Sequence, residues 1–237
     1  RDAQESRGLG DVYKRQKWGA AERVSIPTGT LRGAMAPNMK VLRSLKPVSM
    51  RRQGEKWILD MGQNMVGWVR MNVRGELGDS IKLRFAELLQ PDGELYVKNL
   101  RDAKVTDTYI CNARENNATW APRFVYHGFR YVEVSGFPTA TINDFVGEVV
   151  SDEMEELGTF TTSNETLNRI HQNAWWGILG NYKGMPVDCP QRNERQPWLG
   201  DRTMGTWGES YLFGNGPLYS KWIRDICEAQ REDGCCL

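Results

Sequence analysis

Apolar and polar residues alternate along the chain from about residue 40 to residue 150. The alternation is clearest at residues 69–73 and 81–85, where every second residue is Val, Met, Ile, Leu or Phe. A period of two places one face of a strand on a core and the other toward water. Turn-forming residues separate the runs, as at residues 74–78 and 91–93. The pattern therefore predicts an antiparallel β-sandwich of the jelly-roll kind.

The spacing of apolar residues changes to 3.6 after about residue 155, which is typical of helices. Thr162 and Glu165 have the spacing of a capping box at the start of the first helix. Gly180 or Gly184 is expected to end that helix. Its apolar stripe comprises Leu167, Ile170, His171, Ala174, Trp175, Ile178, Leu179 and Tyr182.

Two more helices are expected, one from about residue 201 to 213 and one that has Pro217 near its first position. The apolar stripes are too broad for these helices to cover each other fully. Their missing partners must come from the β part, another chain or residues outside this sequence. The order β then α favours domains in series. We expect a tail of a preceding module or a foreign segment at residues 1–35, a β-sandwich at 36–152 and the start of a helical domain at 153–237.

Composition narrows the classes of function. The 31 Lys and Arg nearly cancel the 30 Asp and Glu, which argues against a nucleic-acid or membrane-surface binder. No apolar run is long enough to insert into a membrane, and residues 1–17 lack the apolar core of a signal peptide. Nine Trp suit carbohydrate contact, although a Trp-rich core explains them equally well. Two His and five Cys without a C-x-x-C motif predict free thiols and no metal site.

Charged residues are densest between the first two expected helices. The carboxylates Asp188, Glu194 and Asp201 lie there with three Arg and Trp198, and three Pro make the segment a loop. Glycoside cleavage needs a carboxylic acid that protonates the leaving oxygen and a second group across the sugar ring. Neighbouring carboxylates raise one another's pKa and Arg lowers it, so such a loop could hold one acid protonated. A surface loop held by Arg–carboxylate pairs is the alternative.

Residues 188–201, from Asp-Cys-Pro-Gln-Arg to Trp-Leu-Gly-Asp, resemble the signature loop of the bacterial α-L-rhamnosidases, an inverting glycoside hydrolase family. The resemblance covers about residues 31–235. Further motifs of the family lie upstream of this loop. They occur in the family's order, at residues 60–70, 87–89, 99–101, 106–109 and 122–134.

This resemblance implies concanavalin-like β-sandwich modules followed by an (α/α)6 barrel that cleaves terminal α-L-rhamnosyl residues without a cofactor. It implies Glu194 as the general acid, and Asp188, Arg192, Trp198 and Asp201 as the residues that line the sugar pocket. The general base of the family is a Glu much further along the barrel. We therefore expect a truncated barrel and a chain that is inactive alone.

The resemblance also implies a rhamnose-containing glycan or glycoside as the partner. The charge balance and the lack of a long apolar run argue against nucleic acid and membrane insertion. The resemblance favours the periplasm or the outside of the cell. Two alternatives stay open: a non-catalytic carbohydrate-binding sandwich, and an (α/α)6 glycosidase for another sugar. The sequence leaves linkage, aglycone and oligomeric state undefined.

Several other polar residues are expected to have structural roles. Residues 60–64 suit a strand end and turn that are rich in side-chain hydrogen bonds. His127 is expected to cap a turn or to bridge the β and helical parts, and His171 to be buried in the helical core. A structural role is expected for Glu209, which is too near in sequence to serve as the missing base.

Overall fold

The computed structural model describes residues 21–26, 29–112 and 118–235. The chain divides into two compact units, residues 1–33 and 34–237. In the first unit the described residues are exposed and form neither helix nor strand. The expectation for residues 1–17 lies outside the described residues. Every element below belongs to the second unit.

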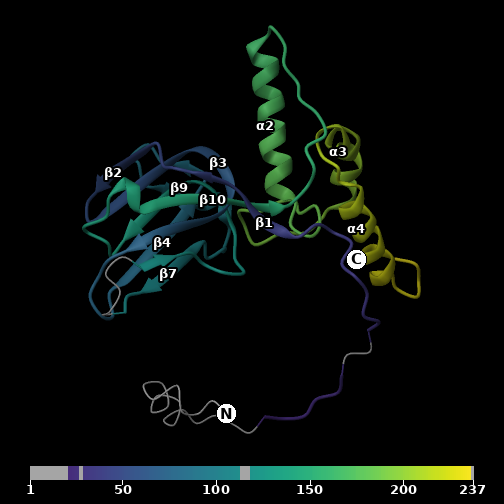
Figure 1. Cartoon of the computed structure of the whole chain (residues 1–237), viewed down its shortest axis with the longest axis horizontal. Helices are drawn as coiled ribbons and strands as arrows, with labels where there is room; N and C mark the ends of the chain where they lie inside the picture. Colours follow the sequence, from purple (N-terminus) through teal and green to yellow (C-terminus); the bar gives the residue numbers. More distant parts are fainter. Residues whose placement is uncertain (1–20, 27–28, 113–117, 236–237) are drawn as a thin grey trace. The chain divides into compact units, whose positions relative to one another are not determined.

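One antiparallel sheet dominates the first part of this unit (Figure 1). Its main path runs β1-β10-β3-β9-β4-β7, while β2 and β8 also pair with β3. A separate two-stranded ribbon joins β5 to β6. The strands are β1 (Met39–Leu45), β2 (Ser49–Gln53), β3 (Lys56–Val73), β4 (Ser80–Ala86), β5 (Leu88–Leu89), β6 (Leu95–Tyr96), β7 (Thr106–Ile110), β8 (Ala118–Trp120), β9 (His127–Ser135) and β10 (Phe145–Asp152). Two short 3₁₀ helices, η1 (Lys98–Leu100) and η2 (Ile142–Asp144), lie between strands.

The long strand β3 makes the sheet curl. Its first part pairs with β2, and its last part pairs with β10 and β8. Its pairing with β9 changes register between Asp60 and Met65, where Gly62 has a φ of +73°. Such irregularities bend a strand and increase its twist. The expected antiparallel β domain is confirmed, and all its strands except β5 and β6 form one continuous curled sheet.

The predicted alternation accounts for the core of this sheet. At residues 69–73 and 81–85 every second side chain is at most 1% exposed. His127 is also buried, and its Nε2 lies 3.0 Å from Asp107 Oδ1 while its ring stacks on Phe85. The expectation that His127 caps a turn or bridges the two parts is therefore wrong, because its partners lie within the sheet. Asp60 has the expected structural role, because it accepts two hydrogen bonds from Arg130. The expected strand end and turn at residues 60–64 is wrong, since these residues lie inside β3.

Three helices follow the sheet, as predicted: α2 (Glu165–Asn181), α3 (Leu199–Leu212) and α4 (Gly216–Ala229). Helix α3 begins two residues earlier than expected, and α4 has Pro217 in its first turn. Among the described residues, the helices are too short or too polar to cross a membrane.

The ends of α2 differ from the prediction. Asn164 is the N-cap, and its side chain accepts from the backbone N–H groups of Thr166 and Leu167. The Thr162 hydroxyl instead bonds the Asn168 side chain, so the predicted capping box is wrong. The helix ends at Asn181 rather than at either expected glycine, because the buried Tyr182 adopts an extended conformation.

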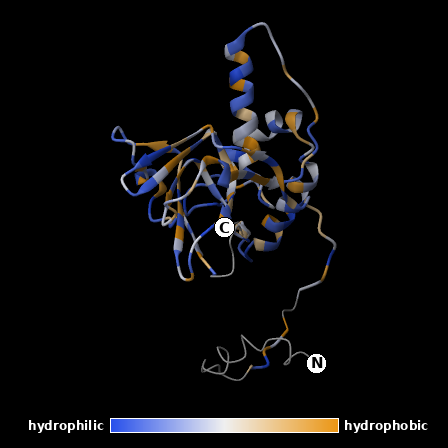
Figure 2. Ribbon diagram, turned by 60° about the vertical axis from the view of Figure 1, so that its left-hand side comes forward, coloured by the Kyte–Doolittle hydropathy of each residue, from blue (hydrophilic) through white to orange (hydrophobic). Residues whose placement is uncertain are grey.

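Only the C-terminal end of the α2 apolar stripe is covered. Leu179 is 2% exposed, whereas Leu167 and Ile170 are 46% and 58% exposed. Helix α2 contacts β3 and β10 and rises away from the sheet, and Figure 2 shows hydrophobic positions along it. His171 is half-buried and stacks on Phe160, so the expected burial of His171 in a helical core is wrong.

A polar network lies between the helices. The carboxylate of Glu209, which is 4% exposed, forms an ion pair with Arg202 at 2.6 Å. It also accepts hydrogen bonds from the hydroxyls of Tyr182 at 2.9 Å and Tyr219 at 2.7 Å. The predicted structural role of Glu209 is confirmed.

Candidate functional site

The loop that joins α2 to α3 is closed by its own backbone. Val187 N–H donates to Asn181 C=O at 2.8 Å, and Asp188 N–H donates to Gln196 C=O at 3.1 Å. From α3, the guanidinium of Arg202 donates to Val187 C=O at 2.6 Å. Asp188 and the residues up to Gln196 therefore form a compact turn whose base is tied to both helices.

The β part of the unit braces the other side of this loop. Arg195 donates to the carbonyl of Tyr126 at 2.7 Å, and its guanidinium lies 4.2 Å from the Tyr126 ring centre. At Gly128 an added Cβ would lie 2.8 Å from Gln191 Cβ, so only a glycine lets strand β9 approach so closely. The Asn193 side chain bonds the Asp102 side chain. The loop is therefore held in place by the β part as well as by the helices.

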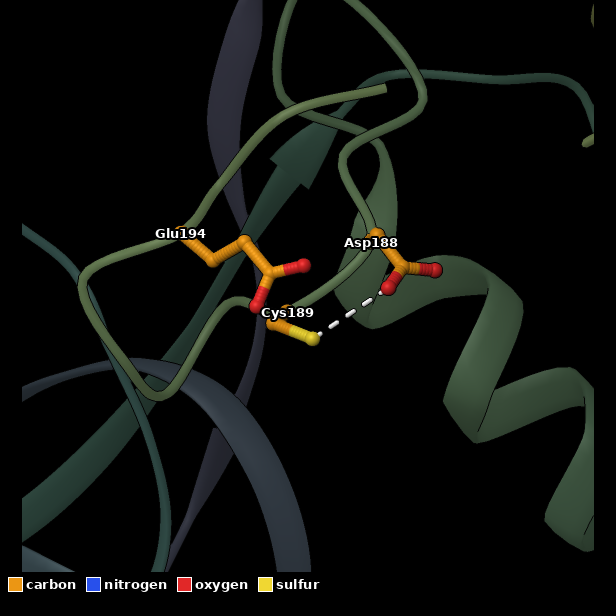
Figure 3. A group of neighbouring side chains, drawn as sticks. All are labelled: Asp188, Cys189 and Glu194. Carbon is orange, nitrogen blue, oxygen red and sulfur yellow. Dashed lines mark hydrogen bonds between the residues drawn. The ribbon is translucent and has the colours of Figure 1, made fainter. Parts of the chain in front are cut away.

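Asp188, Cys189 and Glu194 converge inside this turn (Figure 3). One donor atom from each residue lies within 4.8 Å of the others. Asp188 and Cys189 are neighbours in sequence, whereas Glu194 reaches them from the opposite limb of the loop. The Arg192 guanidinium lies 2.6 Å from Glu194 Oε2, and Trp198 Nε1 donates to Glu194 Oε1 at 2.7 Å. Four of the five site residues predicted from the sequence are thus brought together.

Glu194 carries the clearest electrostatic signature. The hydrogen bond from Trp198, together with the positive charges of Arg192 and Arg101, lowers the pKa of the Glu194 carboxyl. These groups favour the ionised form because each interacts with the negative charge. The described residues alone therefore hold Glu194 as a carboxylate. This differs from the sequence-based expectation that the loop could keep one acid protonated by itself.

The spacing of this cluster limits its chemistry. The carboxyl oxygens of Asp188 and Glu194 that face each other lie within 4.8 Å, which is closer than the separation of about 6.5–9.5 Å in an inverting pair. Burial and the hydrogen bond to Asp188 raise the pKa of Cys189 to about 11. In these surroundings the thiol form of Cys189 is favoured over the thiolate.

The remaining predicted residue lies apart from the cluster. Asp201 is exposed in the first turn of α3, and among the described residues no hydrogen bond or ion pair joins it to the other four. Trp198 is the N-cap of the same helix and is 46% exposed. Its indole N–H is engaged with Glu194, which leaves the ring to form an apolar wall beside the carboxylate.

A polar cavity of about 400 Å³ adjoins Asp188. Asn64 and Glu87 line one side, and Trp176 and Asn181 of α2 line the other. Amide groups, two carboxylates and an aromatic ring suit a neutral ligand that is rich in hydroxyl groups. Trp176 of α2 thus lies beside this cavity.

The sequence did not predict Arg101 as a residue of the site. Its Nη1 lies 3.1 Å from Glu194 Oε2, although the residue belongs to the turn after η1 in the β part. The motif at residues 99–101 marks this turn, but nothing in local spacing reveals a contact with a residue more than ninety positions away.

Two family models match the chain. The concanavalin-like domain of bacterial α-L-rhamnosidase matches residues 50–151, and the six-hairpin glycosidase domain of the same enzymes matches residues 155–237. The two ranges together cover well over half of the chain. The chain belongs to the bacterial α-L-rhamnosidase family. The curled sheet thus matches the concanavalin-like domain of these rhamnosidases, and the three helices match part of their helical domain.

Named α-L-rhamnosidases are similar in sequence. That of Formosa agariphila is 43% identical over 183 residues, which are 75% of this chain and 19% of that protein. That of Streptomyces avermitilis is 41% identical over 179 residues, which are 75% of this chain and 17% of that protein. The chain therefore spans about a fifth of the length of these rhamnosidases.

Solved α-L-rhamnosidases share the fold. The structure from Dictyoglumus thermophilum matches with a TM-score of 0.86 and 38% identity, over 90% of this chain and 24% of that one. The Streptomyces avermitilis enzyme, complexed with L-rhamnose, matches with a TM-score of 0.83 and 36% identity, over 86% of this chain and 20% of that one.

Proposed function

We propose that the complete protein hydrolyses terminal α-L-rhamnosyl residues of glycosides or polysaccharides, with Glu194 as the general acid. The observation that carries this proposal is the Glu194 carboxylate, which is anchored by Trp198 and Arg192 at the centre of a loop braced on both sides. A general acid must hold its proton at a defined point beside the leaving oxygen. This loop provides such a fixed carboxyl group without further ligands.

The other four residues predicted from the sequence would bind the rhamnosyl group. The carboxylates of Asp188 and Asp201 would accept hydrogen bonds from sugar hydroxyls, and Arg192 would donate to them. The exposed ring of Trp198 would pack on an apolar face of the sugar. No cofactor is needed for this chemistry.

The general base would lie outside this sequence. Asp188 is too close to Glu194 to activate a water on the far side of the sugar, and Glu209 is occupied by Arg202 and two tyrosines. A carboxylate added nearby would also raise the pKa of Glu194, since like charges oppose ionisation. The base would therefore complete the pair and help to protonate the acid, which is why we expect this chain to be inactive alone.

The proposed division of the chain follows the change in the spacing of apolar residues, from two to 3.6, near residue 153. Residues 36–152 would form the β-sandwich domain, 153–237 the truncated start of an (α/α)6 barrel, and 1–35 a preceding or foreign segment. On α3, Met204, Trp207 and Tyr211 are 87%, 78% and 75% exposed, as expected where further barrel helices would pack.

Substitution of Glu194 by Gln in the complete enzyme tests the acid role. For alkyl α-L-rhamnosides, we expect kcat/KM to fall by about 10²–10⁴-fold. The loss should be much smaller for p-nitrophenyl α-L-rhamnoside, whose leaving group needs little protonation. Glu232→Gln, an exposed acid beyond α4, is the control and should leave both rates unchanged. Equal losses on the two substrates would contradict a general acid.

The stereochemistry of the first product separates the mechanisms. Proton NMR of early hydrolysis should show the β anomer of rhamnose, as a single displacement requires. Formation of the α anomer would exclude inversion. Turnover by the 237 residues alone that vanishes in Glu194→Gln would show that no external base is needed. Rhamnose binding that survives deletion of residues 155–237 would favour the alternative, a carbohydrate-binding sandwich.

A further inference from the structure

The carboxylate of Glu194 is held by residues from two separate parts of the chain. Arg192 and Trp198 belong to its own loop, whereas Arg101 reaches it from the turn that follows η1 in the β part. The Glu194 side chain is only 13% exposed, so these three contacts define its surroundings to a large extent.

The turn that carries Arg101 is fixed by its own packing. Leu100 is 1% exposed in the β core, and its N–H donates to Val97 C=O at 3.0 Å. Ala103 N–H donates back to Leu100 C=O at 3.2 Å. A side chain that leaves this turn therefore starts from a rigid point of the sheet domain.

The backbone at Arg101 has an unfavourable conformation. Its φ is +57° and its ψ is −126°, a region in which glycine is favoured and a side chain is strained. Strained residues persist where the surrounding structure imposes them, and they cluster at functional sites. Here the conformation lets the guanidinium reach Glu194 while the next residue, Asp102, bonds Asn193. Two consecutive residues of the β part thus hold two consecutive residues of the loop.

We propose that Arg101 is a positioning residue supplied by the β domain, which holds the Glu194 carboxyl in its working position. This inference rests on the proposed role of Glu194 as the general acid. Arg101 differs from Arg192 in its origin, because it moves with the sheet and not with the loop. It therefore links the alignment of the acid to the docking of the two domains.

The charge of Arg101 has a second consequence. A guanidinium 3.1 Å from a carboxylate favours its ionised form, so removing it should make Glu194 protonate more readily. A general acid has to be protonated, and activity is lost as the pH rises through its pKa. Loss of Arg101 should therefore move the alkaline limb of the pH profile to higher pH while it lowers kcat.

The first experiment measures the titration of Glu194 directly. In the 237-residue chain, the side-chain carboxyl carbon signal of Glu194 is identified by its loss in Glu194→Gln and is followed by NMR against pH. Arg101→Gln should shift the Glu194 titration to higher pH. Arg231→Gln removes the same charge from an exposed arginine–carboxylate pair outside the loop, with Asp233, and should leave it unchanged.

The second experiment measures the complete enzyme. Arg101→Gln should lower kcat for an alkyl rhamnoside by on the order of 10-fold with little change in KM, because the acid is misplaced rather than the sugar. The alkaline limb of the kcat/KM profile should move to higher pH. Arg101→Lys should keep the charge and so return both kcat and the alkaline limb part of the way to the values of the unsubstituted enzyme. If Arg101→Gln fails to fold, Arg101→Gly replaces it, since glycine suits the backbone at this position.

The outcomes separate the two proposals. An unchanged Glu194 titration in a folded Arg101 variant, or an equal shift in Arg231→Gln, would overturn the inference even if Glu194→Gln is inactive. A complete enzyme that keeps its activity in Glu194→Gln would overturn the proposed function, whatever the titration shows. An altered titration together with an unaltered pH profile and kcat would also reject Arg101 as a positioning residue.

Discussion

The sheet and the helices of the 34–237 unit bury their large side chains in different ways. In the sheet, Leu59, Leu83 and Phe129 are fully buried in one continuous core. In the helices, Leu218 and Trp222 are buried, but Trp207 of α3 is 78% exposed. The core of the sheet continues into Leu179 and Leu218 of the helices, while the described part of α3 leaves a large apolar side chain exposed.

The difference indicates which interactions stabilise the sheet and which stabilise the helices. A sheet that is hydrophobic on its inner face is stabilised by burying apolar area. The helices bury a polar network in addition to apolar side chains, because the Glu209 carboxylate lies there with Arg202, Tyr182 and Tyr219. Buried charges are tolerated only when they are paired and hydrogen-bonded. The helices therefore rely on this network until an apolar partner covers their outer face.

Replacement of Glu209 by Ala should have the largest effect on stability. It would leave the Arg202 charge buried without its partner, at a cost of about 3–5 kcal/mol. Denaturant unfolding followed by circular dichroism measures this loss, and the helical signal should fall first. The control is Glu232→Ala at an exposed acid. A loss below about 1 kcal/mol for Glu209→Ala would show that the network does not support the helices.

Two leucine substitutions compare the sheet core with the outer face of α2 directly. Leu59→Ala in the sheet should cost about 2–5 kcal/mol, since this side chain is fully buried. Leu167→Ala on α2 should change stability by about 0.5 kcal/mol or less, because its side chain is 46% exposed. Chemical denaturation of the 237-residue chain gives both values. Equal losses would mean that the outer face of α2 is already covered in solution.

Asp144 tests a charged contact at the edge of the sheet core. Burial would raise the pKa of Asp144, but hydrogen bonds from Arg74 and Thr141 outweigh it and lower the pKa. A lowered pKa stabilises the fold fully above the unfolded value of about 3.9, and this stabilisation is lost as the pH falls through the folded pKa. Asp144→Asn should cost about 1.5–3 kcal/mol at pH 7. The difference from the unsubstituted chain should shrink in acid, and a difference independent of pH would contradict this account.

Asn164→Ala should have a modest effect, about 0.5–2 kcal/mol, because α2 loses its N-cap. Hydrogen exchange of the first turn of α2 should accelerate, with little change in the sheet. Ser163→Ala, one residue earlier, is the control and should leave exchange unchanged. If the sheet lost protection as well, the helix and the sheet would unfold as one unit.

Much of the fold follows from local patterns. The alternation at residues 69–73 and 81–85 predicted buried strands, and the 3.6-residue spacing predicted three helices in the right places. Patterns failed where the outcome depends on tertiary contacts. Thr162 has the spacing of a capping box, yet its hydroxyl bonds Asn168, and Asn164 caps the helix. His171 lies on the apolar stripe, but no core forms around that end of α2.

The site was predictable to a similar degree. Loop chemistry and the family motif selected Asp188, Arg192, Glu194 and Trp198, and these four do converge. Asp201 was selected by the same motif but stays outside the cluster. The contact with Arg101 was not predictable, because it depends on how a turn of the sheet meets a loop far along the chain.

Gly128 has a consequence for how these enzymes could be recombined. Strand β9 meets Gln191 so closely that an added methyl group at Gly128 would lie 2.8 Å from the Gln191 side chain. A chimera that joins the sheet domain of one relative to the barrel of another would have to match surface shape at this point. A cut between the sheet and α2 would separate these two fitted surfaces, so the sheet and the loop that carries Gln191 would have to be exchanged together.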